Sequence, residues 1–184
     1  MKLRKKEMET TLVNVQELKY KTISEIIKEL NVEYSVPVDL KNLGCKLQVS
    51  IVPLDFDDHQ LDGEKIICAF VTNEKAHSCI FYNVELSEDY EFVAGRHGII
   101  QAFVKYIITG DNNFFITQST YFSQREKMLT YEMLMPKSQV EDVLYQLIMP
   151  TTYSLAKIFG VSQSFVKHRL DQMYIRRKIG NYNY

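Results

Sequence analysis

The sequence predicts an α+β fold in which a short β-sheet packs on helices and further helices form the C-terminal end. Apolar residues alternate or cluster in short runs between residues 46 and 83, as they do in strands. From residue 87 onward they recur at the spacing of amphipathic helices. Gly and Pro are scarce, at 7 and 4 of 184 residues, which argues against a disordered chain or a loop-rich scaffold.

The first half of the chain predicts one helix, a helical turn and three strands. The helix is expected over 18–30, because three isoleucines and Leu30 fall on one face, with Lys and Glu opposite. The helical turn begins within 36–40. The strands, rich in β-branched and aromatic residues, are expected at 46–54, 65–72 and 78–83, with a hairpin connection at 73–76.

The second half predicts helices joined by loops. Ser87, followed by two acidic residues, marks a helix start, and an apolar stripe then continues to Gly110. After a loop at 111–113, helices are expected at 121–135 and 138–148, each ended by a proline. The last segment, 154–170, has a short helix, a glycine-containing turn, a serine N-cap and a second helix, which is a helix-turn-helix pattern.

Bulk properties favour a cytoplasmic protein. Hydrophobic residues make up 46% of the chain, enough for a core. The three cysteines lie far apart and form no CxxC pair, which fits a reducing compartment. No apolar run approaches the length of a membrane span, and no apolar segment follows the basic N-terminus as it would in a secretory signal.

Four segments, in this order, are similar to a known family. They are SVPVDLKNLGCKLQVSIV at 35–52, IFYNVELSEDYEFVAGRHGII at 80–100, REKMLTYEMLMP at 125–136 and LAKIFGVSQSFVKHRL at 155–170. Together they resemble the ImmA/IrrE-type metallopeptidases, from about residue 26 to residue 175. The MLMP sequence and the terminal helical pair are the most specific of these features.

The resemblance implies a zincin-like domain whose central helix carries the motif HExxH, with two zinc-binding histidines and a glutamate base. This sequence departs from the motif, because Arg96 and Ile100 stand at the histidine positions and His97 stands at the glutamate position. A guanidinium stays protonated and isoleucine has no donor atom, so neither side chain can bind zinc. The acidic-ligand position falls near Ser123, and the nearest acid is Glu126.

The resemblance therefore implies a pseudo-metallopeptidase without zinc, another cofactor or catalytic residues. The degenerate peptidase domain would span 1–136, and a helix-turn-helix-like module with a basic tail would span 137–184. Family members act on helix-turn-helix repressors, often of phages and mobile elements. We therefore expect a regulatory protein that binds such a repressor without cleaving it, through a vestigial cleft formed by Arg96, His97, Ile100, Ser123 and Glu126.

Two alternatives remain open. The C-terminal pair predicts a DNA-binding transcription regulator, in which Gln163 and Lys167 read bases and Arg169 lies near the phosphates. The basic stretch at 176–178 would add salt-sensitive phosphate contacts. The third hypothesis is a hydrolase with a site rebuilt around His97 and Glu126. The sequence leaves the partner and the oligomeric state open.

Overall fold

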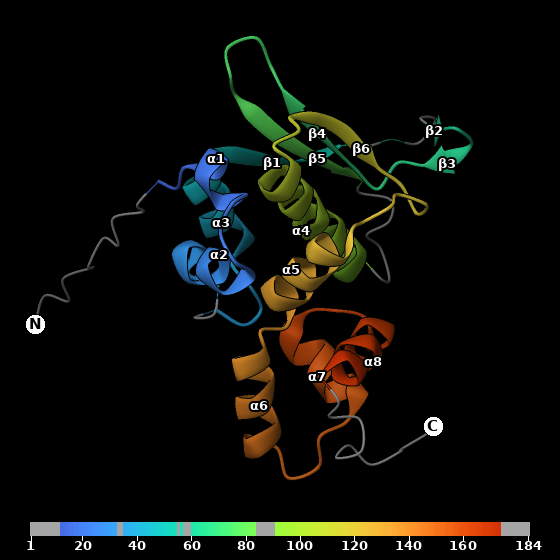
Figure 1. Cartoon of the computed structure of the whole chain (residues 1–184). Coiled ribbons are helices and arrows are strands. Elements are labelled where there is room, and N and C mark those ends of the chain that lie inside the picture. The colour runs from blue at the N-terminus through green and yellow to red at the C-terminus, as the bar shows by residue number, and fades with distance from the viewer. Residues whose placement is uncertain (1–11, 33–34, 55, 57–59, 84–90, 174–184) are drawn as a thin grey trace, which may run out of the picture.

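A four-stranded mixed sheet lies at one end of the molecule, α4 and α5 lie in the middle, and α6, α7 and α8 lie at the opposite end (Figure 1). The computed structural model describes residues 12–32, 35–54, 56, 60–83 and 91–173. The described part contains both helices and a sheet, so the α+β prediction is confirmed. The expected helix start at Ser87 lies outside the described residues.

The strand order in the sheet is β1-β5-β4-β6. The first pair, β1 (Val49–Leu54) and β5 (Ser78–Asn83), is parallel, whereas β4 (Cys68–Thr72) runs antiparallel to both β5 and β6 (Asn113–Ile116). A separate hairpin is formed by β2 (Gln60–Leu61) and β3 (Glu64–Lys65). The expected connection at 73–76 is confirmed, because Asn73 N–H donates to the His77 carbonyl at 3.0 Å.

Two strand predictions and one loop prediction were wrong at their boundaries. The strand expected over 46–54 begins only at Val49, because Asp39 caps a helix, α3 (Leu40–Leu47), that continues until Gln48 adopts a left-handed conformation. The strand expected over 65–72 begins at Cys68. The loop expected at 111–113 ends one residue early, since Asn113 opens β6, which the sequence analysis missed.

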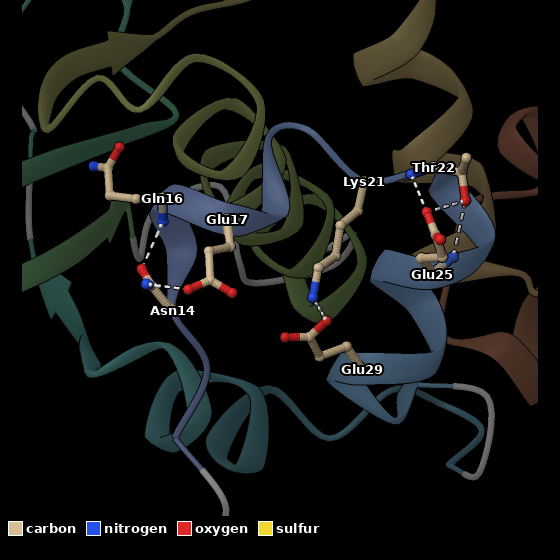
Figure 2. A network of polar contacts seen from close by, with 7 residues as sticks. All are labelled: Asn14, Gln16, Glu17, Lys21, Thr22, Glu25 and Glu29. Atoms are coloured by element: carbon tan, nitrogen blue, oxygen red, sulfur yellow. Dashed lines mark hydrogen bonds and ion pairs between the residues drawn. The ribbon is translucent and has the colours of Figure 1, made fainter.

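The helix expected over 18–30 is two helices, α1 (Val15–Leu18) and α2 (Ile23–Leu30). Figure 2 shows the polar contacts at the start of each helix and at the turn between them. The Thr22 hydroxyl accepts from Glu25 N–H at 3.3 Å, and the Glu25 carboxylate accepts from Thr22 N–H at 2.7 Å. This capping box starts α2 at Ile23, and an ion pair between Lys21 and Glu29 ties the preceding turn to the helix.

The remaining helices agree closely with the predicted positions. They are α4 (Glu91–Thr109), α5 (Gln124–Leu134), α6 (Lys137–Gln146), α7 (Thr152–Phe159) and α8 (Gln163–Gln172). Gly110 ends α4 with a positive φ of 77°, as a helix C-terminus favours. The two terminal helices meet at Gly160 and Ser162, in the turn and N-cap positions that the sequence predicted.

One hydrophobic cluster extends from Leu18 in α1 to Leu170 in α8 and includes the inner faces of the sheet and of α4. Met133 and Leu134 from α5 belong to the same cluster as Phe159 from α7. The core therefore continues across residue 136. None of the described helices is both long and apolar enough to cross a bilayer.

The packing of α4 against Ile67, just before β4, and against Tyr82 in β5 can be tested with two glycines of that helix. A Cβ at Gly98 would lie 2.6 Å from Ile67 Cγ2, so we expect Gly98→Ala to lower the free energy of unfolding by about 1–3 kcal/mol. A Cβ at Gly95 would meet the Tyr82 ring at 3.6 Å, an ordinary contact. Gly95→Ala should therefore raise stability by up to about 1 kcal/mol in urea titrations. Equal effects would contradict this packing.

Candidate functional site

Helix α4 carries the three residues that stand at the motif positions, and it holds two of them inside the protein. Ile100 is fully buried in the main core. Arg96 is 4% exposed, and its guanidinium donates to the carbonyl of Val38, just before α3. Burial lowers the pKa of Arg96, and the nearby Asp39 carboxylate partly offsets that effect. Arg96 therefore serves as an internal brace between α4 and the segment that leads into α3.

Arg96 also contacts the turn between α7 and α8. A Cβ placed on Gly160 would lie 3.6 Å from Arg96 Cδ, so the turn passes directly over the arginine side chain. Gly160 has a φ of 62°, a conformation that glycine adopts without strain. The position that resemblance assigns to a zinc ligand is thus covered by the C-terminal helical pair.

His97 packs against α8. Its ring meets the Phe165 ring edge-on, with 5.1 Å between centroids. Burial lowers the pKa of His97 to about 4, because the charged imidazolium loses its hydration there. The imidazole is therefore neutral at pH 7 and acts as part of the packing between α4 and α8.

Ser123 and Glu126 form the N-terminal cap of α5. Glu126 Oε2 accepts from Ser123 N–H at 2.6 Å, and the Ser123 hydroxyl accepts from Glu126 N–H at 3.3 Å. This is a capping box, which the serine and the acid three residues later signal in the sequence. Glu126 is 4% exposed, and among the described residues none donates to its other oxygen, Oε1.

None of the five residues predicted to form a vestigial cleft is exposed in the described structure. Arg96, Ile100 and Glu126 are buried, and Ser123 and His97 are half-buried. Their polar groups are used for bracing and capping within the fold. An open hollow of about 750 Å³ does occur between α3 and β1, but it is lined by Leu40, Lys41, Gly44, Cys45, Gln48, Val49, Ser50 and Ile51 and by none of the predicted residues.

Other reactive groups are also placed by the fold. Within the described ranges, no three His, Cys, Asp or Glu residues gather closely enough to hold a metal ion. Cys68 is fully buried, and its thiol donates to the Gly98 carbonyl at 3.3 Å. Burial raises the pKa of both Cys68 and Cys79, so both are protonated thiols at neutral pH.

The terminal helical pair exposes one polar face. Gln163, Ser164, Lys167 and His168 are exposed on α8, and the Ser162 hydroxyl caps the helix by accepting from Phe165 N–H at 3.1 Å. Phe165 and Val166 point into the core. The residues predicted to read bases, Gln163 and Lys167, are thus accessible.

Arg169 is a correction to that predicted contact set, because its side chain is only 1% exposed. Its Nε donates to the carbonyl of Met135 at 3.0 Å, and its Nη2 meets Glu132 Oε1 at 2.5 Å. The guanidinium also donates to Gln172 and lies over the Tyr131 ring, 5.8 Å from the centroid. Arg169 joins α8 to the end of α5 and cannot contact phosphates from this position.

The sequence analysis missed Glu132 as the partner of Arg169. A signal was present, since Arg169 lies three and four residues after Val166 and Phe165 and therefore shares their inward face. A basic residue on an apolar face indicates a buried partner.

Comparisons with models of known protein families, with curated proteins and with solved structures found no match.

The role of Arg169 can be measured by denaturation. Arg169→Ala removes the donor to the Met135 carbonyl and one of two donors to the Glu132 carboxylate, which still accepts from Lys137 N–H at 3.1 Å. We expect a loss of about 3 kcal/mol in the free energy of unfolding. Lys167→Ala, an exposed change on the same helix, should stay within about 0.5 kcal/mol. A double variant with Glu132→Ala should lose little more than Arg169→Ala alone. Additive losses would show that the pair is not coupled.

The pKa of His97 makes stability depend on pH. A folded pKa of about 4 lies below the unfolded value of 6.5, so the unfolded chain binds the proton first. The part of the free energy of unfolding that depends on a neutral His97 is fully present above pH 6.5. It falls by up to about 3 kcal/mol as the pH drops toward 4. In urea titrations the stability gap between wild type and His97→Gln should narrow over that range. His168→Gln is the exposed control, and a constant gap for His97→Gln would contradict the assignment.

Proposed function

We propose that this protein is a cytoplasmic, ImmA/IrrE-like regulator that binds a partner protein without cleaving it. The partner we propose is a helix-turn-helix repressor-like protein of a phage or mobile element. The observation that carries the proposal is that the residues at the expected zinc-ligand positions have structural roles in the fold. Arg96 braces the fold, Ile100 fills the core, and Glu126 caps a helix.

The chemistry of these side chains supports binding over catalysis. A catalytic zinc site needs about three ligands that can donate an electron pair, and neither Arg96 nor Ile100 can do so. His97 offers an imidazole, but its ring packs on Phe165. A hydrolase rebuilt around His97 and Glu126 would have to release both side chains from packing and capping, and it has less support.

Binding of a partner protein does not require the predicted vestigial cleft. A buried guanidinium and a buried carboxylate offer no surface to another protein. Regulation by binding needs only that the complex be more favourable than the partner's other interactions, and then it shifts the partner population by mass action. The binding surface is therefore to be sought among exposed residues.

A DNA-binding regulator is the second candidate function. The observation that favours it is the exposed polar face of α8, with Gln163 and Lys167 on a helix whose N-terminus is capped. Loss of Arg169 from the contact set weakens this candidate, because phosphate contacts supply most of the affinity for DNA.

The two functions and the peptidase alternative separate in one set of measurements. The tagged full-length protein is purified from its native cells, and the co-purifying proteins are identified and weighed by intact-mass spectrometry before and after incubation with zinc. We expect a near-stoichiometric DNA-binding protein whose mass does not change. A partner mass reduced by cleavage, in a way that a chelator blocks, would establish the peptidase instead.

The control for the DNA candidate is a gel shift with genomic fragments and no partner present. A shift by the protein alone that weakens with salt and with Lys167→Ala would favour the second function. If neither a partner nor a DNA shift is found, both candidate functions fail.

A further inference from the structure

Exposed apolar side chains gather where α6 leads into α7. Tyr145 is 92% exposed, Ile148 98%, Met149 64% and Tyr153 62%. These four make up over a third of the eleven large hydrophobic residues that are exposed in the described part of the chain. They lie within nine consecutive residues. Such a concentration on a surface marks a site of interaction more often than a chance exposure.

The fold holds this segment in place from its inner side. Val140 is fully buried, and Val143, Leu144 and Leu147 pack against the main core. At the other end, Thr151 caps α7, with its hydroxyl accepting from Ser154 N–H at 3.0 Å. The exposed residues therefore sit on an anchored support, which lowers the entropy cost of binding through them.

Two acidic side chains adjoin the first of these apolar residues on α6. Glu141 and Asp142 are both exposed on α6, three or four residues before Tyr145, and so lie one helical turn from it. The nearest basic residues along the chain are Lys137, four residues before Glu141, and Lys157, four residues after Tyr153, so they lie at the two ends of this segment. We call this surface the α6–α7 face, formed by Glu141, Asp142, Tyr145, Ile148, Met149 and Tyr153. Figure 1 shows the end of α6 and its connection to α7 at the end of the molecule farthest from the sheet.

The combination of apolar and acidic groups selects the kind of occupant. Phosphates of DNA and anionic lipid headgroups would be repelled by Glu141 and Asp142. A second copy is also disfavoured, because a twofold interface would join the face to an identical face, and the six residues that define it include no base to pair with Glu141 and Asp142. A helix with an apolar stripe flanked by basic residues satisfies both the exposed side chains and the charge.

We propose that the α6–α7 face docks a basic amphipathic helix of the partner protein. The apolar stripe of that helix covers Tyr145, Ile148 and Met149, and its basic residues pair with Glu141 and Asp142. This inference rests on the proposed partner-binding function and gives it a surface. DNA-binding proteins carry basic helices for phosphate contact, so the proposed partner class supplies the required chemistry.

The test uses a synthetic helical peptide of about 18 residues, with leucines and one tryptophan on one face and lysines on the other. The protein has no Trp, so the fluorescence signal belongs to the peptide. We expect a saturable blue shift on titration with the full-length protein, weakened by salt. A matched peptide with glutamates in place of the lysines should have an affinity at least about tenfold lower.

Variants then assign the binding to the face. Ile148→Glu and Tyr145→Ala should each weaken binding of the basic peptide about tenfold, as anchor residues do. Tyr121→Ala, at a tyrosine that is 79% exposed elsewhere on the surface, is the matched control and should change nothing. The double variant Glu141→Lys, Asp142→Lys should reverse the preference toward the acidic peptide. All five substituted sites are exposed, so unfolding midpoints should be unchanged.

Three results would overturn the proposal: equal or absent binding of the two peptides, self-association of the wild type that Ile148→Glu abolishes, or binding to anionic vesicles in place of the basic peptide. Failure of the face and failure of the function are distinguishable. A co-purified partner that binds Ile148→Glu as well as wild type would remove the face and keep the function. Peptide binding that depends on Ile148, with no partner in the cell extract, would do the reverse.

Discussion

The buried guanidinium of Arg169 is the interaction on which the arrangement of the C-terminal half depends. A buried arginine must place its charge against an acceptor, because a charge without a partner in the interior costs several kcal/mol. Arg169 finds a carboxylate on Glu132 and the carbonyl of Met135 at the end of α5. That carbonyl lies beyond the last turn of the helix, where backbone acceptors lack intrahelical donors. One side chain thus completes the end of α5 and fixes α8 beside it.

The fixed position of α8 explains why Arg96 and His97, in the N-terminal part of α4, are covered. With α8 held against α5, Phe165 reaches the ring of His97, and the turn at Gly160 passes over Arg96. Each contact shields the N-terminal part of α4 from water. The low pKa of His97 follows from that exclusion, since the environment penalises the charged ring. The helical pair and the central helix therefore form one packed unit.

Most of the elements were predictable from local signals, and the errors occurred where distant contacts decide. The strand at Ser78–Asn83 follows from its content of β-branched and aromatic residues, and the cap at Ser162 follows from capping chemistry. The strand at Asn113–Ile116 follows a polar loop and is short, so only its pairing with β4 identifies it. Arg169 was assigned to the surface because its partner, Glu132, lies 37 residues earlier in the chain. The capping box at Ser123 was readable locally, but the resemblance directed attention to zinc ligation.

The burial of the residues at the expected ligand positions, and the exposure of those on the α6–α7 face, explain why we place the interaction site on that face. Where the resemblance places chemistry, the polar groups now stabilise the fold, and a group engaged in this way cannot also be offered to a ligand without a cost of a few kcal/mol. At the α6–α7 face the reverse holds, since apolar side chains that could stabilise a core are left in water. Selection for stability alone would replace Ile148 with a polar residue, because nothing in the described fold covers it. The simplest physical reason for an isoleucine in that position is a bound state in which it is buried.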